Sequence, residues 1–119
     1  MREELTSLAY VDCDCDVEEF QTWVWEAVAP FSNGNPEYNS VQGIIIHAWY
    51  NKEHMPEVYK YTIYFIPRDH DVPDDQFLMQ IKMIKAILKR LRERQCRVYF
   101  LTHSDEYFPE EGNNEPDKS

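Results

Sequence analysis

Apolar and polar residues alternate in four stretches of the chain, a pattern typical of strands that bury one face. The four stretches are residues 5–13, 41–50, 58–66 and 96–103. Successive side chains of a strand point to opposite faces. In the second stretch, Ile44 and Ile46 would therefore lie on one face, with Ile45 and His47 on the other. The pattern predicts four strands, of which the second and third form a hairpin with a longer turn than two residues.

A stripe of apolar residues at steps of three and four predicts a first helix over residues 17–29. Asp16 followed by Glu19 has the spacing of a capping box, with aspartate in place of serine or threonine. Pro30 closes the helix because it has no backbone N–H to donate. Trp23 and Trp25 cannot both face the core of one amphipathic helix, so one of them is expected to be exposed.

A second helix is predicted over residues 75–94, where apolar residues again recur at steps of three and four. Asp71 or Asp74 is expected to cap it, with Pro73 in its first turn. Six basic side chains crowd its later turns, which suits the negative end of a helix dipole.

The elements follow one another as strand, helix, strand, strand, helix, strand. This order predicts an α+β fold, a ferredoxin-like βαββαβ two-layer sandwich. Its four-stranded antiparallel sheet would carry both helices on one face, because crossover connections are right-handed. The first strand would lie inside that sheet and pair with the last strand, which would form one edge.

The length of 119 residues predicts one domain, over residues 1–104. Residues 105–119 have little to bury and are expected to form an acidic flexible tail. The net charge of −10 is unevenly spread. Residues 1–75 hold 4 basic and 15 acidic side chains, whereas residues 76–104 hold 7 basic and 1 acidic. Such polarity favours a basic protein partner, or self-association of unlike faces.

The sequence lacks the motifs of several function classes. With only three glycines, the chain has neither a P-loop nor a dinucleotide-binding fingerprint, so no cofactor is predicted. No apolar run is long enough for a transmembrane helix, and no signal peptide follows Met1, so we expect a cytoplasmic protein of a bacterial or host cell without membrane contact. The odd number of cysteines predicts free thiols in a reducing compartment.

The stretch DCDCD, residues 12–16, raises the question of a metal site. An EF-hand loop that starts at Asp12 would need glycine at its sixth position and glutamate at its twelfth, where this chain has Val17 and Trp23. Pairing of the first and last strands would bring the cysteines together at one end of the sheet. No metal is predicted, but a weak candidate ligand set exists, namely Cys13, Cys15, Cys96 and His54.

The sheet face turned away from the helices is predicted to be unusually apolar for a solvated surface. Apolar and aromatic sheet faces commonly bind a partner, and acidic side chains nearby would attract a basic one. The candidate partner-binding residues are Ile45, His47, Trp49, Glu53, Glu57 and Tyr64, with Glu18, Glu19 and Glu26 of the first helix as a second group.

The sequence therefore predicts a small, acidic, non-catalytic protein-interaction protein. An inhibitor or immunity-type protein, or a phage or viral accessory protein, that binds and neutralises a partner fits these features. One alternative is a homodimeric ligand-binding domain or small enzyme with its site where two sheet faces meet. A second alternative is nucleic-acid binding through the basic helix over residues 75–94, which the acidity of the rest of the chain disfavours.

Overall fold

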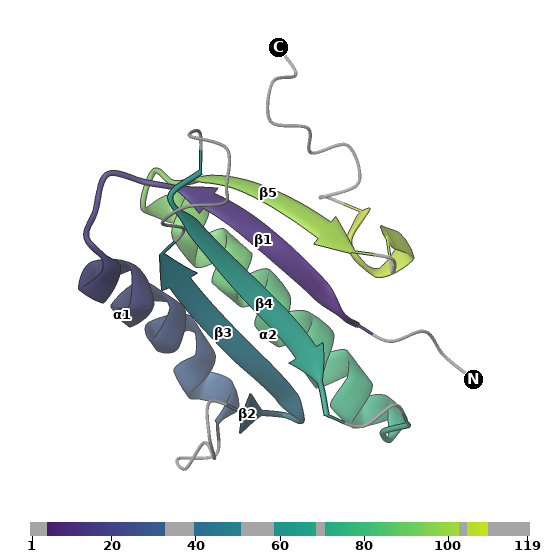
Figure 1. The fold of residues 1–119 in the computed structure, drawn as a ribbon. Coiled ribbons are helices and arrows are strands. Elements are labelled where there is room, and N and C mark those ends of the chain that lie inside the picture. Colours follow the sequence, from purple (N-terminus) through teal and green to yellow (C-terminus); the bar gives the residue numbers. More distant parts are fainter. Residues whose placement is uncertain (1–4, 33–39, 51–58, 69–70, 103–104, 110–119) are drawn as a thin grey trace.

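The computed structural model describes residues 5–32, 40–50, 59–68, 71–102 and 105–109 (Figure 1). In chain order the elements are β1 (Ser7–Asp12), α1 (Val17–Val28), the 3-10 turn η1 (Ala29–Phe31), β2 (Ser40–Val41), β3 (Ile44–Tyr50), β4 (Tyr61–Pro67), α2 (Asp74–Glu93), β5 (Arg97–Thr102) and the 3-10 turn η2 (Asp105–Tyr107). The helices and long strands lie where the sequence predicts them, within a few residues at each end.

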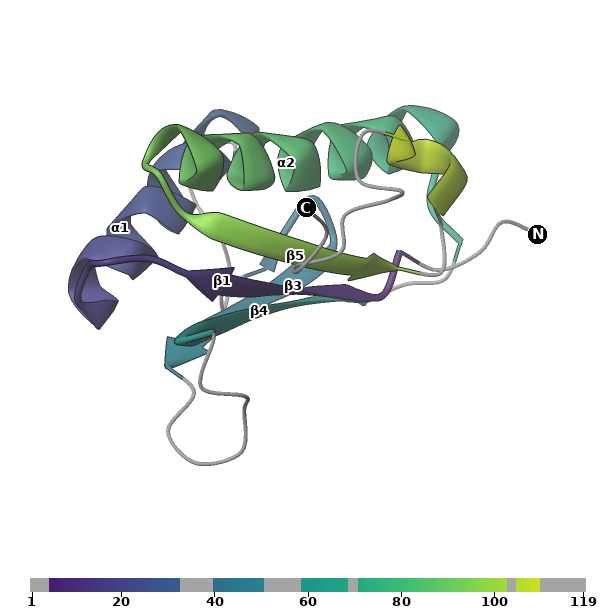
Figure 2. The same cartoon turned by 90° about the horizontal axis from the view of Figure 1, so that it is seen from above.

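The strands form one antiparallel sheet in the order β2-β3-β4-β1-β5. Both helices cover the same face of this sheet, as Figure 2 shows from above. The predicted pairing of the first and last long strands is present, with Val11 of β1 opposite Val98 of β5. The fold is α+β with two helices, but the sheet has five strands rather than the predicted four.

The extra strand arises because the predicted strand 41–50 is broken by a turn. Gln42 and Gly43 have left-handed backbone conformations, with φ of 55° and 82°. A Cβ atom at Gly43 would lie 2.9 Å from Nε2 of Gln76, so glycine also leaves room for α2. The turn folds β2 back onto the first residues of β3 and makes it the edge strand.

Helix α1 begins as the sequence predicts. The carboxylate of Asp16 accepts a 2.8 Å hydrogen bond from the backbone N–H of Glu19, which satisfies one donor of the first turn. The apolar stripe faces the sheet, and its buried members are Phe20, Val24, Ala27 and Val28. After Val28 the chain tightens into the 3-10 turn that contains Pro30.

Helix α2 starts differently from the prediction. Its N-cap residue is Pro73, which makes no side-chain capping hydrogen bond, so the N-cap is neither Asp71 nor Asp74 as predicted. The carboxylate of Asp75 accepts a 3.0 Å hydrogen bond from the backbone N–H of Gln76 in the first turn. Asp74 is instead the first helical residue. At the other end Gln95 adopts φ of 69°, and the N–H of Cys96 donates to the carbonyl oxygen of Leu91. This is a Schellman termination, which turns the chain directly into β5.

Part of the predicted tail packs on the domain. Phe108 is only 1% exposed and contacts the ring of Phe100 at 5.0 Å between centroids. Tyr107 lies edge-on against Phe77 of α2, with centroids 5.1 Å apart. The sequence prediction missed these contacts, since the acidic composition around Phe108 hides its apolar role. The later residues of the tail lie outside the described part of the chain.

Candidate protein-binding surfaces

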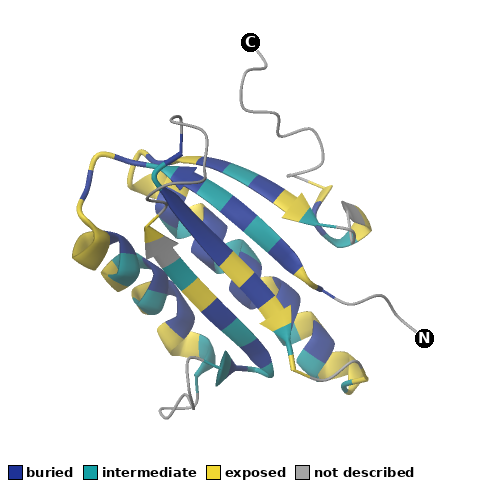
Figure 3. Ribbon diagram, in the orientation of Figure 1, coloured by how far each residue is buried: buried dark blue, intermediate teal, exposed yellow. Residues whose placement is uncertain are grey.

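The face of the sheet opposite the helices is the first candidate site, and we call it the open sheet face. It consists of Leu8, Tyr10, Ile45, His47, Thr62, Tyr64, Ile66, Tyr99 and Leu101. These residues alternate with residues that face the helices, and Figure 3 shows the alternation of burial, except at Thr62, which is itself buried. Ile44 and Ile46 on either side of Ile45 are fully buried, which confirms the facing predicted for β3.

Residues of the open sheet face lie in rows across the strands. His47 of β3 is opposite Tyr64 of β4. Tyr64 is opposite Leu8 of β1, which is opposite Leu101 of β5. Side chains directly opposite one another on antiparallel strands are in contact distance. One row of four adjacent strands therefore presents an imidazole, a phenol and two leucines to the same side.

An apolar groove of about 500 Å³ lies at one end of the open sheet face. It is lined by Thr6, Ser7, Leu8, Tyr64, Ile66, Leu101 and Thr102. Tyr64, Ile66 and Leu101 are 36%, 40% and 38% exposed. Three large apolar side chains, two on β4 and one on β5, thus contribute water-accessible surface to a single hollow.

The other end of the open sheet face is aromatic. The rings of Tyr10 and Tyr99 stack with centroids 6.4 Å apart, and Tyr59 packs on both at 5.9 and 6.5 Å. The guanidinium of Arg97 lies 5.3 Å from the centroid of the Tyr59 ring. Arg97 also pairs with the carboxylate of Asp12 at 3.7 Å. Because these rings already contact one another, this end is packed rather than hollow.

Acidic charge is almost absent from the open sheet face. Within the described strands, Asp12 is the one carboxylate at its border, and Arg97 balances it. Among the described residues up to position 32, the other acids lie elsewhere, on the β1–α1 connection and along α1. In the described part of the chain, the apolar face and the acidic surface of α1 are therefore two distinct regions.

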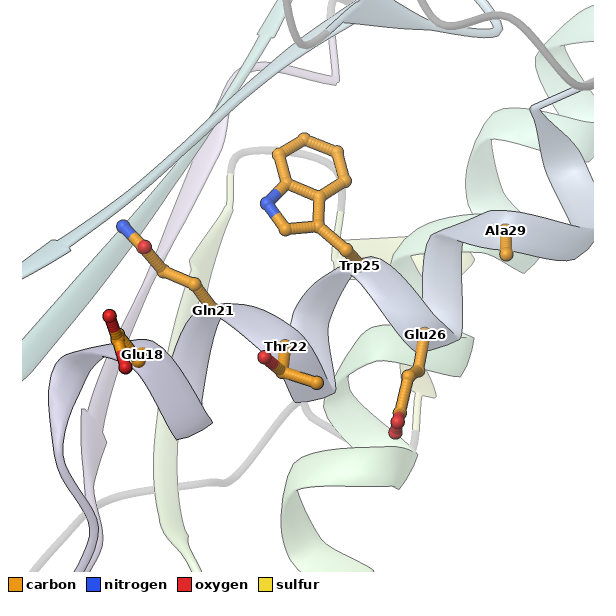
Figure 4. Close-up of a pocket in the computed structure, with 6 residues that line it drawn as sticks. All are labelled: Glu18, Gln21, Thr22, Trp25, Glu26 and Ala29. Carbon is orange, nitrogen blue, oxygen red and sulfur yellow. The ribbon is translucent and has the colours of Figure 1, made fainter.

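A second hollow, of about 630 Å³, runs along the outer side of α1, and we call it the α1 groove. It is lined by Glu18, Gln21, Thr22, Trp25, Glu26 and Ala29 (Figure 4). These residues recur at steps of three and four, so they form one stripe of the helix. Nε2 of Gln21 donates a 2.8 Å hydrogen bond to the carbonyl oxygen of Ala48 in β3, which fixes the groove to the edge of the sheet.

The two tryptophans of α1 have different surroundings. Both are half-buried, so neither is as exposed as the sequence predicts for one of them. The guanidinium of Arg94 lies 5.4 Å from the centroid of the Trp23 ring. Among the described residues, Trp25 has no hydrogen bond, ring contact or cation of this kind. Its indole borders the α1 groove.

The predicted partner-binding residues divide into three groups. Ile45, His47 and Tyr64 come together on the open sheet face. Trp49 belongs to β3, but its side chain is not among those described, and Glu53 and Glu57 lie outside the described residues. Glu18, Glu19 and Glu26 are exposed on α1.

The prediction missed Leu8 and Leu101 because it considered only the hairpin strands 41–50 and 58–66 in detail, and it also missed Ile66 at the end of the second of these. The alternation of residues 5–13 and 96–103 carried the signal for Leu8 and Leu101.

Basic side chains of α2 are used largely within the chain itself. Arg90 and Arg94 pair with the carboxylate of Glu26 at 3.5 and 3.8 Å, which ties α2 to α1. Arg92 donates to the carbonyl oxygen of Val98 at 3.3 Å, and Nζ of Lys85 lies 5.8 Å from the Phe108 ring centroid. These contacts give the basic helix a structural use that does not require a nucleic acid.

The cysteines differ from the prediction. Cys13 and Cys15 form a disulfide, so the expectation of three free thiols is wrong for these two. Strand β1 ends at Asp12, one residue earlier than predicted, and Cys13 and Cys15 lie in the connection to α1.

Cys96 is the one free cysteine, and its burial, with a smaller effect of Asp12, raises the pKa of its thiol from 9.0 to about 11. A thiol with such a pKa is a poor metal ligand and nucleophile near neutral pH. Within the described ranges no three His, Cys, Asp or Glu side chains are close enough to hold a metal, and His54 lies outside those ranges.

The end of the sheet beside these cysteines is tied together by Tyr61. Its hydroxyl donates to the carbonyl oxygen of Cys15, which also accepts from Nζ of Lys60 at 3.3 Å. The Tyr61 ring stacks on Phe20 of α1 with centroids 4.2 Å apart. Burial, with a smaller effect of Asp16, raises the pKa of the Tyr61 hydroxyl. The geometry is that of a structural phenol rather than a proton-transfer group.

Comparison with protein families, with curated proteins and with solved structures finds no match for this chain. In the described segments, no helix is both long and apolar enough to cross a bilayer.

Proposed function

We propose that this chain is a small, acidic, non-catalytic protein-interaction protein of ferredoxin-like architecture that binds and neutralises a partner protein. An inhibitor or immunity-type protein, or a phage or viral accessory protein, would act in this way. The observation that carries the proposal is the exposure of Tyr64, Ile66 and Leu101 around one groove of the open sheet face.

Contiguous exposed apolar groups on a small domain favour association, because covering them releases water from apolar surface. The groove offers a hollow into which an apolar or aromatic anchor of a partner would fit, and such central pockets supply most of the affinity of an interface. A β-sheet supports this surface rigidly, which lowers the conformational entropy lost on binding.

The acidic side chains of α1 and of the preceding connection add long-range attraction for a basic partner. Helix α1 contains Glu18, Glu19 and Glu26 and no basic residue. Charge at a distance from the docking groove accelerates encounter, whereas the buried apolar contacts slow dissociation. In this proposal the open sheet face holds the partner and the acidic surface steers it.

A homodimer through the open sheet face is the second candidate, and the near absence of charge on that face favours it. Two chains of net charge −10 repel each other, but the described acid at the border, Asp12, is already balanced by Arg97. Two copies of this face could approach without placing like charges opposite one another. A ligand site or weak catalysis at that interface would then belong to the dimer.

Two matched variants separate these functions. Ile66→Lys places a charge in the groove of the open sheet face, whereas Leu78→Lys places the same charge at a 55% exposed leucine of α2. Light scattering after size-exclusion chromatography, at micromolar concentration, reports the oligomeric state. Affinity purification from cells of the source, followed by mass spectrometry, reports a bound protein.

The first proposal expects a monomer that retains a basic protein, with retention lost in Ile66→Lys and kept in Leu78→Lys. A stable dimer that Ile66→Lys dissociates and Leu78→Lys does not would favour the second function. A monomer whose captured protein remains bound to Ile66→Lys would contradict a partner site on the open sheet face.

A further inference from the structure

One side of helix α1 holds an arginine between an aromatic ring and a carboxylate. On one side of the helix, the guanidinium of Arg94 lies 5.4 Å from the Trp23 ring centroid and 3.8 Å from the carboxylate of Glu26. An arginine is thus placed between an indole and a carboxylate. This combination stabilises a guanidinium through both its charge and its flat face.

The α1 groove presents the same two acceptors without a cation. Trp25 and Glu18 are seven residues apart, two turns of one helix, and both line the groove. Among the described residues neither has a cation or a hydrogen-bonding partner of its side chain. Glu26, the other acid of the groove, is already paired with Arg90 and Arg94.

Gln21 lies between these two positions and is held in place. Its Nε2 donates to the carbonyl oxygen of Ala48, so its amide oxygen remains as an acceptor. Figure 4 shows Gln21 and Trp25 projecting toward the same side of α1, with Glu26 on the other side. A flat indole and a fixed amide therefore project toward one side of α1, and Glu18 lines the same hollow of about 630 Å³.

We propose that the α1 groove binds an arginine side chain of a basic partner protein, with the guanidinium on the Trp25 ring and its N–H groups directed at Glu18. Arginine suits the groove better than lysine because its plane can lie on the indole while its edge donates several hydrogen bonds. The absence of basic residues from α1 leaves a partner's cation without a competitor on this helix.

This inference rests on the proposed function only in supposing a basic partner, and it uses a different surface. The test uses the full chain and three capped tripeptides, Gly-Arg-Gly, Gly-Lys-Gly and Gly-citrulline-Gly. Citrulline keeps the planar shape of arginine without its charge, and lysine keeps the charge without the plane. The indole N–H signal of Trp25 in ¹⁵N–¹H spectra, assigned with Trp25→Phe, reports occupancy of the groove.

The expected result is a saturable shift of the Trp25 signal with the arginine peptide, a weaker response to lysine and none to citrulline. Glu18→Gln should weaken the arginine peptide about threefold, the size of one exposed charged contact. Glu19→Gln removes the same charge one residue away, outside the lining of the groove, and should leave the affinity nearly unchanged. The Trp23 signal should not move.

Three results would overturn the inference. An unmoved Trp25 signal excludes the site, and equal weakening by Glu18→Gln and Glu19→Gln reduces it to general attraction. A Trp25 signal that shifts on dilution without peptide assigns the groove to a second copy of the chain. Ile66→Lys should leave peptide binding intact, so failure of the open sheet face and failure of this groove give different outcomes.

Discussion

The side-chain amide of Gln80 donates a 2.8 Å hydrogen bond to the backbone carbonyl oxygen of Gln42. This contact joins α2 to the turn between β2 and β3 across 38 residues of sequence. Gln80 is 2% exposed, and Gln76 donates a second hydrogen bond, of 3.0 Å, to the same carbonyl oxygen. Two glutamines one turn apart thus hold a turn whose backbone is left-handed at two positions.

Gln80→Ala should lower the free energy of unfolding by about 1–3 kcal/mol, because the variant loses a buried side chain and its hydrogen bond to Gln42. Urea denaturation measures this change as a lower midpoint at an unchanged slope. Gln76→Ala is the matched control, because Gln76 is half-buried and water can replace its amide. A cost for Gln76→Ala as large as that for Gln80→Ala would show that burial does not decide the contribution.

Gln95→Gly should raise the stability by up to about 1 kcal/mol, because a left-handed residue after a helix end favours glycine. Gln95 has φ of 69°, and its N–H donates to the carbonyl oxygen of Arg92 at 3.0 Å. Gln95→Ala shortens the side chain without relieving the backbone and should give no gain. Thermal unfolding of the three proteins compares them, and equal melting temperatures for Gly and Ala would refute the explanation.

Tyr61→Phe should cost about 1 kcal/mol, since it removes a hydrogen bond to the carbonyl oxygen of Cys15 and keeps the stacking on Phe20. Tyr50→Phe is the control, because Tyr50 is 49% exposed and should change stability by less than about 0.5 kcal/mol. Chemical denaturation at neutral pH measures both. If the two variants were equally stable, the hydroxyl of Tyr61 would have no net stabilising effect.

Stability should fall as the pH rises from 9 toward 11, because the pKa of the Cys96 thiol is raised from 9.0 to about 11 in the folded chain. In that window the unfolded chain has released the thiol proton and the folded chain still holds it, so ionisation favours unfolding. The raised pKa of Tyr61 acts in the same direction at the alkaline end.

Urea midpoints measured across this pH range test the expectation, with Cys96→Ala as the variant that should show a shallower decline. A midpoint that rises with pH in this window would contradict it.

The pairing of Cys13 with Cys15 predicts a simple labelling pattern. Protein purified without reductant and then unfolded should take up one alkylating group, at Cys96, because the other two sulfurs are bonded to each other. After reduction, three groups should be added. Intact-mass spectrometry counts them, and three additions before reduction would show that the disulfide is absent.

Local patterns in the sequence predict most of the framework. The three- and four-residue steps and the Asp16 cap place α1, and alternation places the long strands, because these signals depend on neighbours within one or two turns. The turn at Gln42 and Gly43 is different. The donors that hold it, Gln76 and Gln80, belong to a helix that is distant in sequence. The local pattern around residue 43 therefore predicts one continuous strand.

The candidate surfaces could be predicted only in part for a similar reason. Alternation correctly assigns Ile45, His47 and Tyr64 to one face. Predicting the groove also requires the register that places Leu101 of β5 beside Leu8 of β1. The disulfide was missed because the odd number of cysteines was interpreted as a sign of free thiols. The two cysteines lie after the end of β1, in the connection to α1.

The hydrogen bond from Gln21 to Ala48 has a consequence for assembly. Strand β2 pairs with only Ile44 and Ile45 of β3, so among the described strands none pairs with the far end of β3 on that side. An incoming strand there would have to displace the amide of Gln21 from the carbonyl oxygen it occupies. The side chain of Gln21 thus also hinders the pairing of a further strand with this edge of the sheet. Such pairing is the step by which exposed sheet edges aggregate.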